Sequence, residues 1–81
     1  MKKSTWNPAI TVEDPETGTL KTVRTVEQAQ SLLHRHWPTP SGSRFRQAEA
    51  VCDDALHGEA ATRDARKAFI AAAIEAHLHL R

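Results

Sequence analysis

The stretch TRDARKAFIAAAIEAHLHLR, residues 62–81, decides the fold of this chain. At roughly 100° per residue, an α-helix over this stretch has two opposing apolar faces. One face contains Phe69, and the other contains Ile70, Ile74 and Leu78. We expect such a helix either to lie between other elements of its own domain or to leave one face for a second molecule. The face around Phe69 comprises Ala65, Phe69, Ala72, Ala76 and Leu80.

Two strands are predicted before the helices. Residues 8–13 alternate between apolar and polar side chains, and a turn at residues 14–18 combines Asp, Pro and Gly. A second strand, residues 19–24, alternates poorly because Leu20 and Val23 fall on opposite faces. The sequence therefore predicts a hairpin whose register stays open.

Capping and stop signals predict the other two helices. Thr25 and Gln28 have the spacing of a capping box, in which Gln28 reaches back to Thr25. Gly58 is of the type that ends helices in a left-handed conformation. The predicted helices begin at Thr25, at Ser41 or Ser43 and at Thr62, and they end at Trp37, Gly58 and Arg81.

These elements predict an α+β fold for the 81-residue chain. It consists of an N-terminal two-stranded antiparallel hairpin followed by three helices, with the last helix central. We expect residues 1–6 to form a flexible tail and residues 7–81 to form a single domain.

The composition is that of a soluble globular protein, with 40% hydrophobic and 26% charged residues. A formal net charge of +1 argues against a general nucleic-acid or membrane-surface binder, because such proteins carry a basic excess. A single cysteine closes no internal disulfide, and no signal peptide or membrane span stands out. We therefore expect a cytoplasmic protein with no membrane partner.

A set of positions spread over nearly the whole chain carries a family resemblance. It consists of Trp37-Pro38, Gly42, Phe45, Ala48, Cys52, Ala55-Leu56, Gly58, residues 65–70 and Glu75-Ala76. At these positions the chain resembles a family of short bacterial proteins, mostly from alphaproteobacteria, known as domain of unknown function 982. The resemblance is consistent with the predicted order of elements, and it implies no activity because none is established for the family.

A basic group lies where the first two helices meet. Arg35, Arg44 and Arg46 fall in a stretch without acids, and two of them stand where the helix dipole disfavours cations. Free amides at this helix start, flanked by guanidinium groups, would suit a phosphate or carboxylate. The alternative, which we favour, is that the arginines are solvated and pair with Glu49, Asp53 or Asp54.

Arg63, Arg66 and Lys67 form a second basic group at the start of the last helix. Glu59 and Asp64 offset most of its charge.

The titratable residues do not suggest catalysis or metal binding. His34 and His36, like His77 and His79, are two residues apart and so point about 200° apart on a helix, which prevents chelation of one ion. Cys52 lies on a buried stripe, where a thiol stays protonated. We expect no enzyme, no metal site and no cofactor.

Two functional hypotheses follow. The first is a non-catalytic protein-interaction module that binds an unknown partner or a second copy of itself through Ile70, Ile74 and Leu78. The second is an anion-binding or nucleic-acid-binding protein that uses Arg35, Arg44 and Arg46, although nucleic acid is the less expected ligand.

Overall fold

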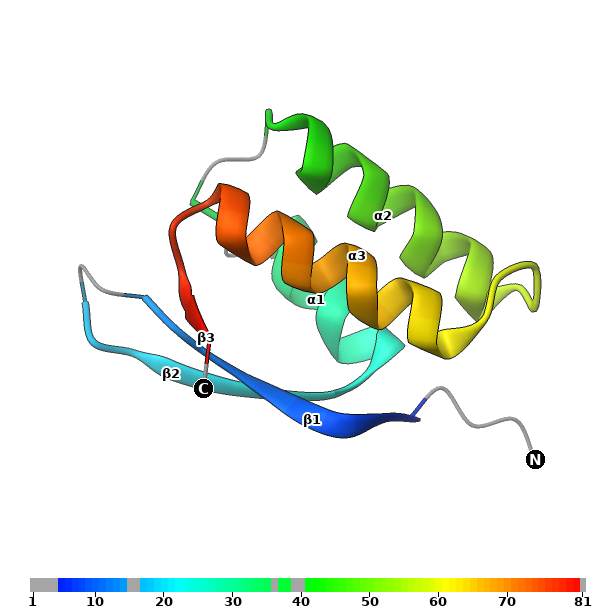
Figure 1. Ribbon diagram of the computed structural model, residues 1–81, viewed down its shortest axis with the longest axis horizontal. Helices are drawn as coiled ribbons and strands as arrows, with labels where there is room; N and C mark the ends of the chain where they lie inside the picture. The colour runs from blue at the N-terminus through cyan, green and yellow to red at the C-terminus, as the bar shows by residue number, and fades with distance from the viewer. Residues whose placement is uncertain (1–4, 15–16, 36, 39–40, 81) are drawn as a thin grey trace.

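Six elements follow one another along the chain (Figure 1). The computed structural model describes residues 5–14, 17–35, 37–38 and 41–80, without the side chain of Asn7. The three helices lie on one face of the sheet, and α2 is separated from the sheet by α3 and α1 (Figure 1). This is an α+β fold. The elements are β1 (Thr5–Glu13), β2 (Leu20–Thr25), α1 (Val26–Arg35), α2 (Ser43–Leu56), α3 (Thr62–Glu75) and β3 (His79–Leu80).

The hairpin of β1 and β2 has a register that the sequence left open. Ile10 pairs with Val23 and Val12 pairs with Lys21. Because side chains alternate along a strand, Val23 faces the helices and is only 2% exposed, whereas Leu20 points outward and is 55% exposed. Leu20 and Val23 fall on opposite faces of β2, and the register places Val23 in the core and Leu20 in solvent.

The N-terminal strand starts earlier than expected. β1 includes Thr5 and Trp6, and the Trp6 side chain is 3% exposed. Its indole Nε1 donates a 2.8 Å hydrogen bond to the carbonyl of Val23. The pairing is irregular between Thr5 and Ile10, where Pro8 has no amide to donate. The predicted flexible tail of residues 1–6 is thus wrong for its last two residues, and its first four lie outside the described residues.

The last helix is shorter than expected. It ends at Glu75, and His77 takes a left-handed conformation with a φ of 63°. The amide of Leu78 then donates to the carbonyl of Ala73 at 3.0 Å, which closes the helix end. Since this conformation reverses the chain, the prediction of a helix as far as Arg81 is wrong.

After the reversal the chain returns to the sheet (Figure 1). β3 runs antiparallel to β1, with Leu80 opposite Val12 and His79 opposite Glu13. Among the described residues the sheet therefore has three strands in the order β2-β1-β3, and the predicted two-stranded hairpin is corrected. The strand is explained by the alternation of His and Leu over residues 77–80, which places every second side chain on one face.

The helix starts also differ in detail from the prediction. The amide of Gln28 donates to Thr25 Oγ1 at 3.1 Å as expected, but Gln28 Oε1 accepts from the amide of Arg24 rather than from Thr25. Gly42 and Ala61 stand at the N-caps of α2 and α3, and neither offers a side-chain hydrogen bond. Serine and threonine therefore do not cap these two helices.

The end of the first helix lies before Trp37. α1 ends at Arg35, and the Trp37 side chain is buried beyond the helix. His36, considered above with His34 as a metal ligand, lies outside the described residues.

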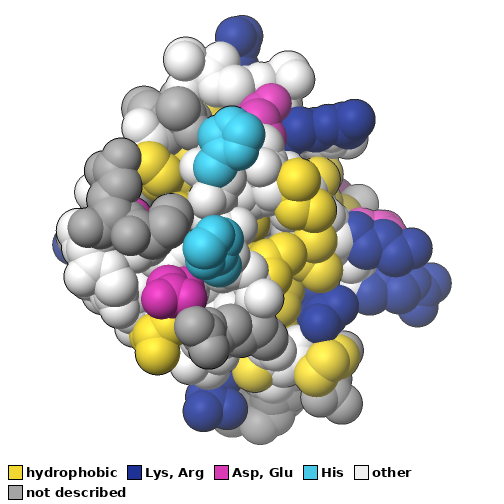
Figure 2. Space-filling view, turned by 60° about the vertical axis from the view of Figure 1, so that its left-hand side comes forward, with side chains coloured by type: hydrophobic (Ala, Val, Ile, Leu, Met, Phe, Trp, Pro, Cys, Tyr) yellow, Lys and Arg dark blue, Asp and Glu magenta, His cyan; other side chains and the backbone are white. Residues whose placement is uncertain are grey.

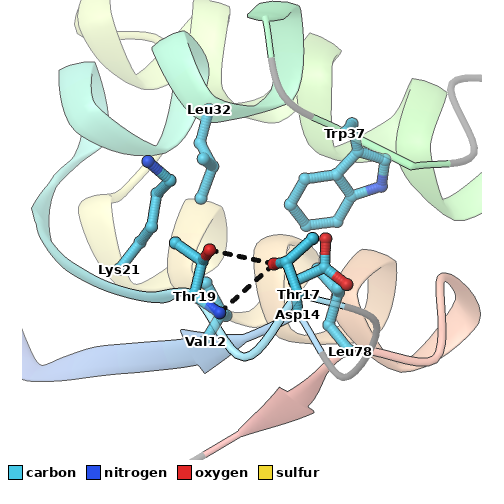
Figure 3. A pocket seen from close by; sticks show the side chains of 8 residues that line it. All are labelled: Val12, Asp14, Thr17, Thr19, Lys21, Leu32, Trp37 and Leu78. Atoms are coloured by element: carbon cyan, nitrogen blue, oxygen red, sulfur yellow. Dashed lines mark hydrogen bonds between the residues drawn. The ribbon is translucent and has the colours of Figure 1, made fainter.

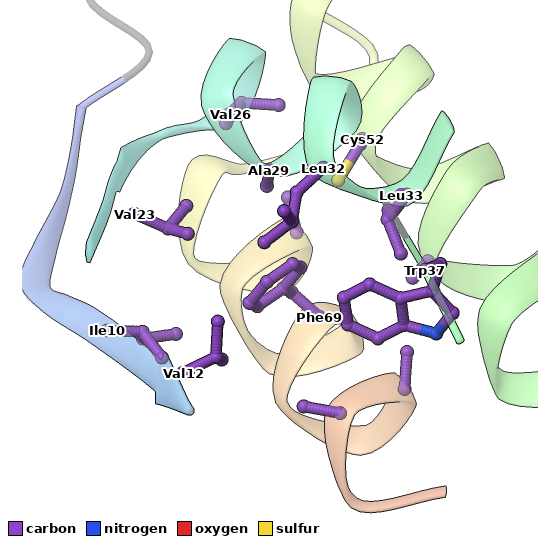
Figure 4. Close-up of a cluster of buried hydrophobic side chains, with 14 of the residues drawn as sticks. Ile10, Val12, Val23, Val26, Ala29, Leu32, Leu33, Trp37, Cys52 and Phe69 are labelled. Carbon is purple, nitrogen blue, oxygen red and sulfur yellow. The ribbon is translucent and has the colours of Figure 1, made fainter. Parts of the chain in front are cut away.

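Four aromatic side chains join the sheet to the helices, and Figure 4 shows two of them, Phe69 and Trp37, in the core. Phe69 of α3 is fully buried, with ring centroids 5.5 Å from Trp6 and 5.4 Å from Trp37. Trp37 in turn lies 6.4 Å from Phe45 of α2. Tilted rings at these separations pack favourably. The face of α3 around Phe69 is thus the centre of the core.

The opposite face of α3 is covered only in part. Ile70 is half-buried, whereas Ile74 is 62% exposed. Leu78 and Leu80 lie beyond the helix end, so they do not continue the two predicted faces, and Leu80 is 37% exposed. The face of α3 around Phe69 is therefore covered by the domain itself, whereas Ile74 on the opposite face is left for solvent or a partner.

Replacing Phe69 by alanine should destabilise the protein strongly. Removing a fully buried aromatic ring costs about 3–5 kcal/mol, since transfer and cavity terms add. Ile74→Ala in the same helix should change stability by less than about 0.5 kcal/mol, because the side chain is largely in solvent. Urea unfolding of both variants measures the difference. Equal losses for the two would contradict the assignment of the core face.

Candidate functional site

The start of α2, where the sequence predicted free amides, is occupied by a side chain of the same protein. The backbone amide of Arg44 donates to Glu75 Oε2, and that of Phe45 donates to Glu75 Oε1, each at 3.1 Å. Ser43 Oγ adds a 3.5 Å contact with Glu75 Oε2. A carboxylate in this position satisfies two unpaired donors and complements the helix dipole. The prediction of free amides here is therefore wrong, and an internal carboxylate takes the place of the expected anion.

Gly42 allows Glu75 to come this close. A methyl group on Gly42 would collide with the Glu75 carboxylate. The backbone of Gly42 has a φ of −71° and a ψ of 154°, which other residues adopt freely. Space for the Glu75 side chain, rather than backbone conformation, therefore explains glycine at this position.

The three arginines of the predicted anion site lie on the surface. Arg44 Nη1 donates to Gln47 Oε1 at 3.5 Å, and Arg46 Nη2 donates to the carbonyl of Ser41 at 3.4 Å. Arg35 ends α1 and is exposed. No hydrogen bond or ion pair joins these arginines to one another within the described residues. The structure therefore shows no shared site among these arginines, and anion binding by them stays a prediction.

Two of the three acids expected to pair with these arginines, Glu49 and Asp53, have histidine neighbours instead. Glu49 Oε2 lies 3.3 Å from His34 Nε2, and Asp53 Oδ1 lies 3.7 Å from His57 Nδ1. His57 Nδ1 also donates to the carbonyl of Asp53 at 2.8 Å. This hydrogen bond, followed by the Asp53 charge, raises the pKa of His57 above its ordinary value. The contacts hold the last turn of α2 and create no evident reactive group.

Cys52 is enclosed by the helices. Its side chain is fully buried, and burial raises the pKa of the thiol to about 12. Since the thiolate is the nucleophilic form, this cysteine is unreactive in the folded protein. In the part of the chain that the structure describes, no three His, Cys, Asp or Glu side chains gather in a way that could hold a metal ion.

The outer face of α3 carries an apolar group beside cations. Ile70 and Ile74 lie about 40° apart on the helix, and Arg63, Arg66 and Lys67 all fall within about 60° of Ile70. Asp64 lies about 120° from Ile70 but only about 60° from Lys67, so it borders this face. Figure 2 shows hydrophobic side chains gathered between Lys and Arg side chains on one side and His side chains on the other. We call this surface, made of Arg63, Arg66, Lys67, Ile70 and Ile74, the α3 outer face.

One of these cations also fixes the helix to the sheet. Arg66 Nε donates to the carbonyl of Pro8 in β1 at 2.8 Å. In the described part of the chain, neither Arg63 nor Lys67 makes a hydrogen bond or ion pair with an acid. Asp64 stands three residues before Lys67 on α3, so the two side chains are neighbours on the helix surface, and the reading that Glu59 and Asp64 offset this charge stays a prediction.

None of the helices traced in the described residues has the length and apolar character needed to cross a membrane. Residues 8–80 match the family described as protein of unknown function (DUF982). No curated protein and no solved structure matches the chain.

The contact between Gly42 and Glu75 should appear as coupled stability changes. Glu75→Ala removes the cap of α2 and should lower the free energy of unfolding by about 1–2 kcal/mol. Gly42→Ala should cost a similar amount by displacing the carboxylate. In the double variant the second substitution should add little, because the collision no longer exists. Urea unfolding of the four proteins measures the coupling.

Glu59→Ala provides the control for removal of a carboxylate, since Glu59 is exposed. Its effect should stay within about 0.5 kcal/mol. Strictly additive losses for Gly42→Ala and Glu75→Ala would show that Glu75 does not cap α2 in solution.

Proposed function

The chain belongs to the DUF982 family, whose function is unknown, and we propose that it is a small cytoplasmic, non-catalytic protein-interaction module. The observation that carries the proposal is the 62% exposure of Ile74 on an otherwise well-packed helix. Contiguous apolar patches mark interaction surfaces, and the exposed Ile74 lies on the same face of α3 as the half-buried Ile70.

The charge around Ile74 supports an acidic partner. Arg63 and Lys67 form no ion pair with an acid among the described residues, and the Arg66 guanidinium lies on the same side of α3. Complementary charge accelerates association and selects the partner, while buried apolar contact supplies affinity. The partner is therefore a segment of another protein that places carboxylates around apolar side chains.

Self-association through the same face is less favourable. In a two-fold dimer each copy presents the same surface to the other. The cations next to Ile70 and Ile74 in one copy would then lie near those of the second copy, and like charges repel. The α3 outer face suits a different, acidic chain better than a second copy of itself.

Leu78 belongs to a different surface. It is half-buried beyond the end of α3 and lines a cavity with Val12 and Trp37. We therefore keep Ile70 and Ile74 in the proposed interaction face and assign Leu78 to the cavity.

The binding proposal predicts a defined response to a model ligand. A short amphipathic peptide with glutamates around leucines should shift the amide resonances of α3 in a saturable titration, and the lysine version of the peptide should not. Lys67→Glu should weaken binding by about tenfold or more, because it replaces attraction by repulsion. Ile74→Asp should remove binding while leaving the fold intact, since Ile74 is exposed.

Arg44→Glu is the matched charge reversal on the other basic group. It should leave peptide affinity unchanged. If Arg44→Glu abolishes binding and Lys67→Glu does not, the anion-binding alternative through Arg35, Arg44 and Arg46 replaces the present proposal. A stable dimer in light scattering that Ile74→Asp dissociates would instead show that the α3 outer face binds a second copy.

A further inference from the structure

β2 is an edge strand of the sheet. The strand order is β2-β1-β3, and β3 at the opposite edge has only two residues, whereas β2 has six. The unpaired amides and carbonyls of an edge strand are a template for one more strand. Peptide-binding domains use such edges to recognise extended segments. Of the two outermost strands, β2 is therefore the longer template.

The hydrogen bonds of the hairpin show which backbone groups of β2 are free. The amide of Asp14 donates to the carbonyl of Thr19 at 3.0 Å, so the backbone of Thr19 faces β1. Because this direction alternates along a strand, Leu20, Thr22 and Arg24 direct their N–H and C=O groups away from β1. Within the described residues, the amides of Leu20 and Thr22 make no hydrogen bond on that side.

One end of this edge is closed by a side chain. Gln28 Oε1 of α1 accepts from the amide of Arg24 at 2.7 Å, which agrees with an amide that faces away from β1. Gln28 thereby takes the place that an added strand would occupy beyond Thr22. We call the remaining backbone groups, those of Leu20 and Thr22, the free β2 edge.

A hollow of about 260 Å³ lies between the free β2 edge and α1. Two of its lining residues, Val23 and Leu32, are buried and close its floor. The other lining residues are exposed and polar, and Figure 3 shows one of them, Lys21, extending from β2 toward α1 beside Leu32. The hollow is therefore shallow, with a polar rim. Its lining consists of Lys21, Thr22, Val23, Gln28, Ser31 and Leu32.

The side chains along this edge are basic. Lys21 and Arg24 are both exposed, and neither forms an ion pair in the part of the chain that the structure describes. Opposite charges on neighbouring strands attract, and like charges repel. A strand that places a carboxylate beside Lys21 is therefore favoured. A second copy of β2 would bring the same two cations toward these, so the charges favour a different, acidic chain.

We propose that β2 binds an extended, acidic segment of another protein as an additional strand of the sheet. The segment pairs its backbone with Leu20 and Thr22, and one Asp or Glu side chain points inward between Lys21 and the rim residues Gln28 and Ser31. The residues before and after this acid point to the outer face of the sheet, where the exposed Leu20 offers apolar contact. The site belongs to β2 and α1, so it is separate from the α3 outer face.

An inward-facing lysine on an edge strand also has a structural role, because it discourages pairing with other chains. The two roles differ in what they exclude. If Lys21 only protects the edge, no added strand is accepted, whatever its sequence. If Lys21 selects a partner, a strand with an acid beside it is accepted, and strands with a basic side chain at that position are rejected.

The test is a titration of the isotope-labelled protein with the blocked peptide Ac-Thr-Val-Glu-Val-Thr-NH2, in which alternation points the glutamate inward. We expect saturable shifts and slower hydrogen exchange at the amides of Leu20 and Thr22. The amide of Arg24, which is already bonded to Gln28, is the internal control, and its exchange should change little. The same peptide with lysine in place of glutamate should bind at least about tenfold more weakly.

Two methylated peptides test the strand pairing itself. Methyl groups on the amides of the two valines remove the donors that face β2, so this peptide should not bind. A methyl group on the amide of the glutamate faces away from β2 and should weaken binding by no more than about threefold. Equal binding by the two methylated peptides would overturn the proposal.

Three variants assign the site on the protein. Lys21→Glu should reverse the preference, so that the lysine peptide binds about tenfold or more tightly than the glutamate peptide. Thr22→Pro removes an amide that faces away from β1, so it should prevent binding while the hairpin is kept. Thr22→Val keeps this amide and loses only the hydroxyl that contacts Thr11, so it should bind like the parent.

The proposal is overturned if the glutamate peptide gives no saturable shift of the Leu20 and Thr22 amides at concentrations up to about 1 mM. An unchanged peptide preference in Lys21→Glu would also overturn it. A dimer in light scattering that Thr22→Pro dissociates would show that β2 pairs with a second copy instead. Lys67→Glu should leave binding at β2 unchanged, so failure at this site and failure at the α3 outer face are distinguishable.

Discussion

The packing of Phe69 between Trp6 and Trp37 is the contact on which the rest of the structure depends. Trp6 belongs to β1, Trp37 follows α1, and Phe45 of α2 packs on the far side of Trp37. These are all the aromatic residues of the chain, which has two Trp, two Phe and no Tyr. Because large buried rings dominate core energetics, this group fixes the sheet, α3 and α2 relative to one another. Alanines at the neighbouring buried positions of α3 allow this close approach.

A second constraint follows from where α3 ends. Glu75, its last residue, caps the start of α2, and the left-handed conformation of His77 then turns the chain back to the sheet. One short segment thus satisfies the amides of a neighbouring helix, closes its own helix and adds β3 to β1. The same arrangement fills the anion site that the start of α2 offers.

Much of the fold could be predicted from the sequence because it depends on local signals. The turn at residues 14–18, the Thr25 and Gln28 cap, the Gly58 stop and the buried face around Phe69 each follow from side-chain chemistry within a few residues. Glu75 capping α2 depends on contacts between residues about thirty positions apart, which no local pattern predicts. The turn at His77 was missed because a helix more often ends at glycine, although the alternation of His and Leu after it was a visible strand signal.

The candidate sites were less predictable than the fold. Ile70 and Ile74 could be singled out because their helical spacing is independent of the rest of the molecule. The free β2 edge could not, since it is defined only once the hairpin register is known.

Native-state hydrogen exchange tests the central claim most directly. If the aromatic group joins sheet and helices into one cooperative unit, the amides of Val23 in β2, Cys52 in α2 and Phe69 in α3 should exchange only through global unfolding. Their exchange free energies should then equal the unfolding free energy measured in denaturant. Exchange of Val23 or Cys52 at a clearly lower free energy than Phe69 would show that the sheet or α2 opens independently, and it would contradict the account.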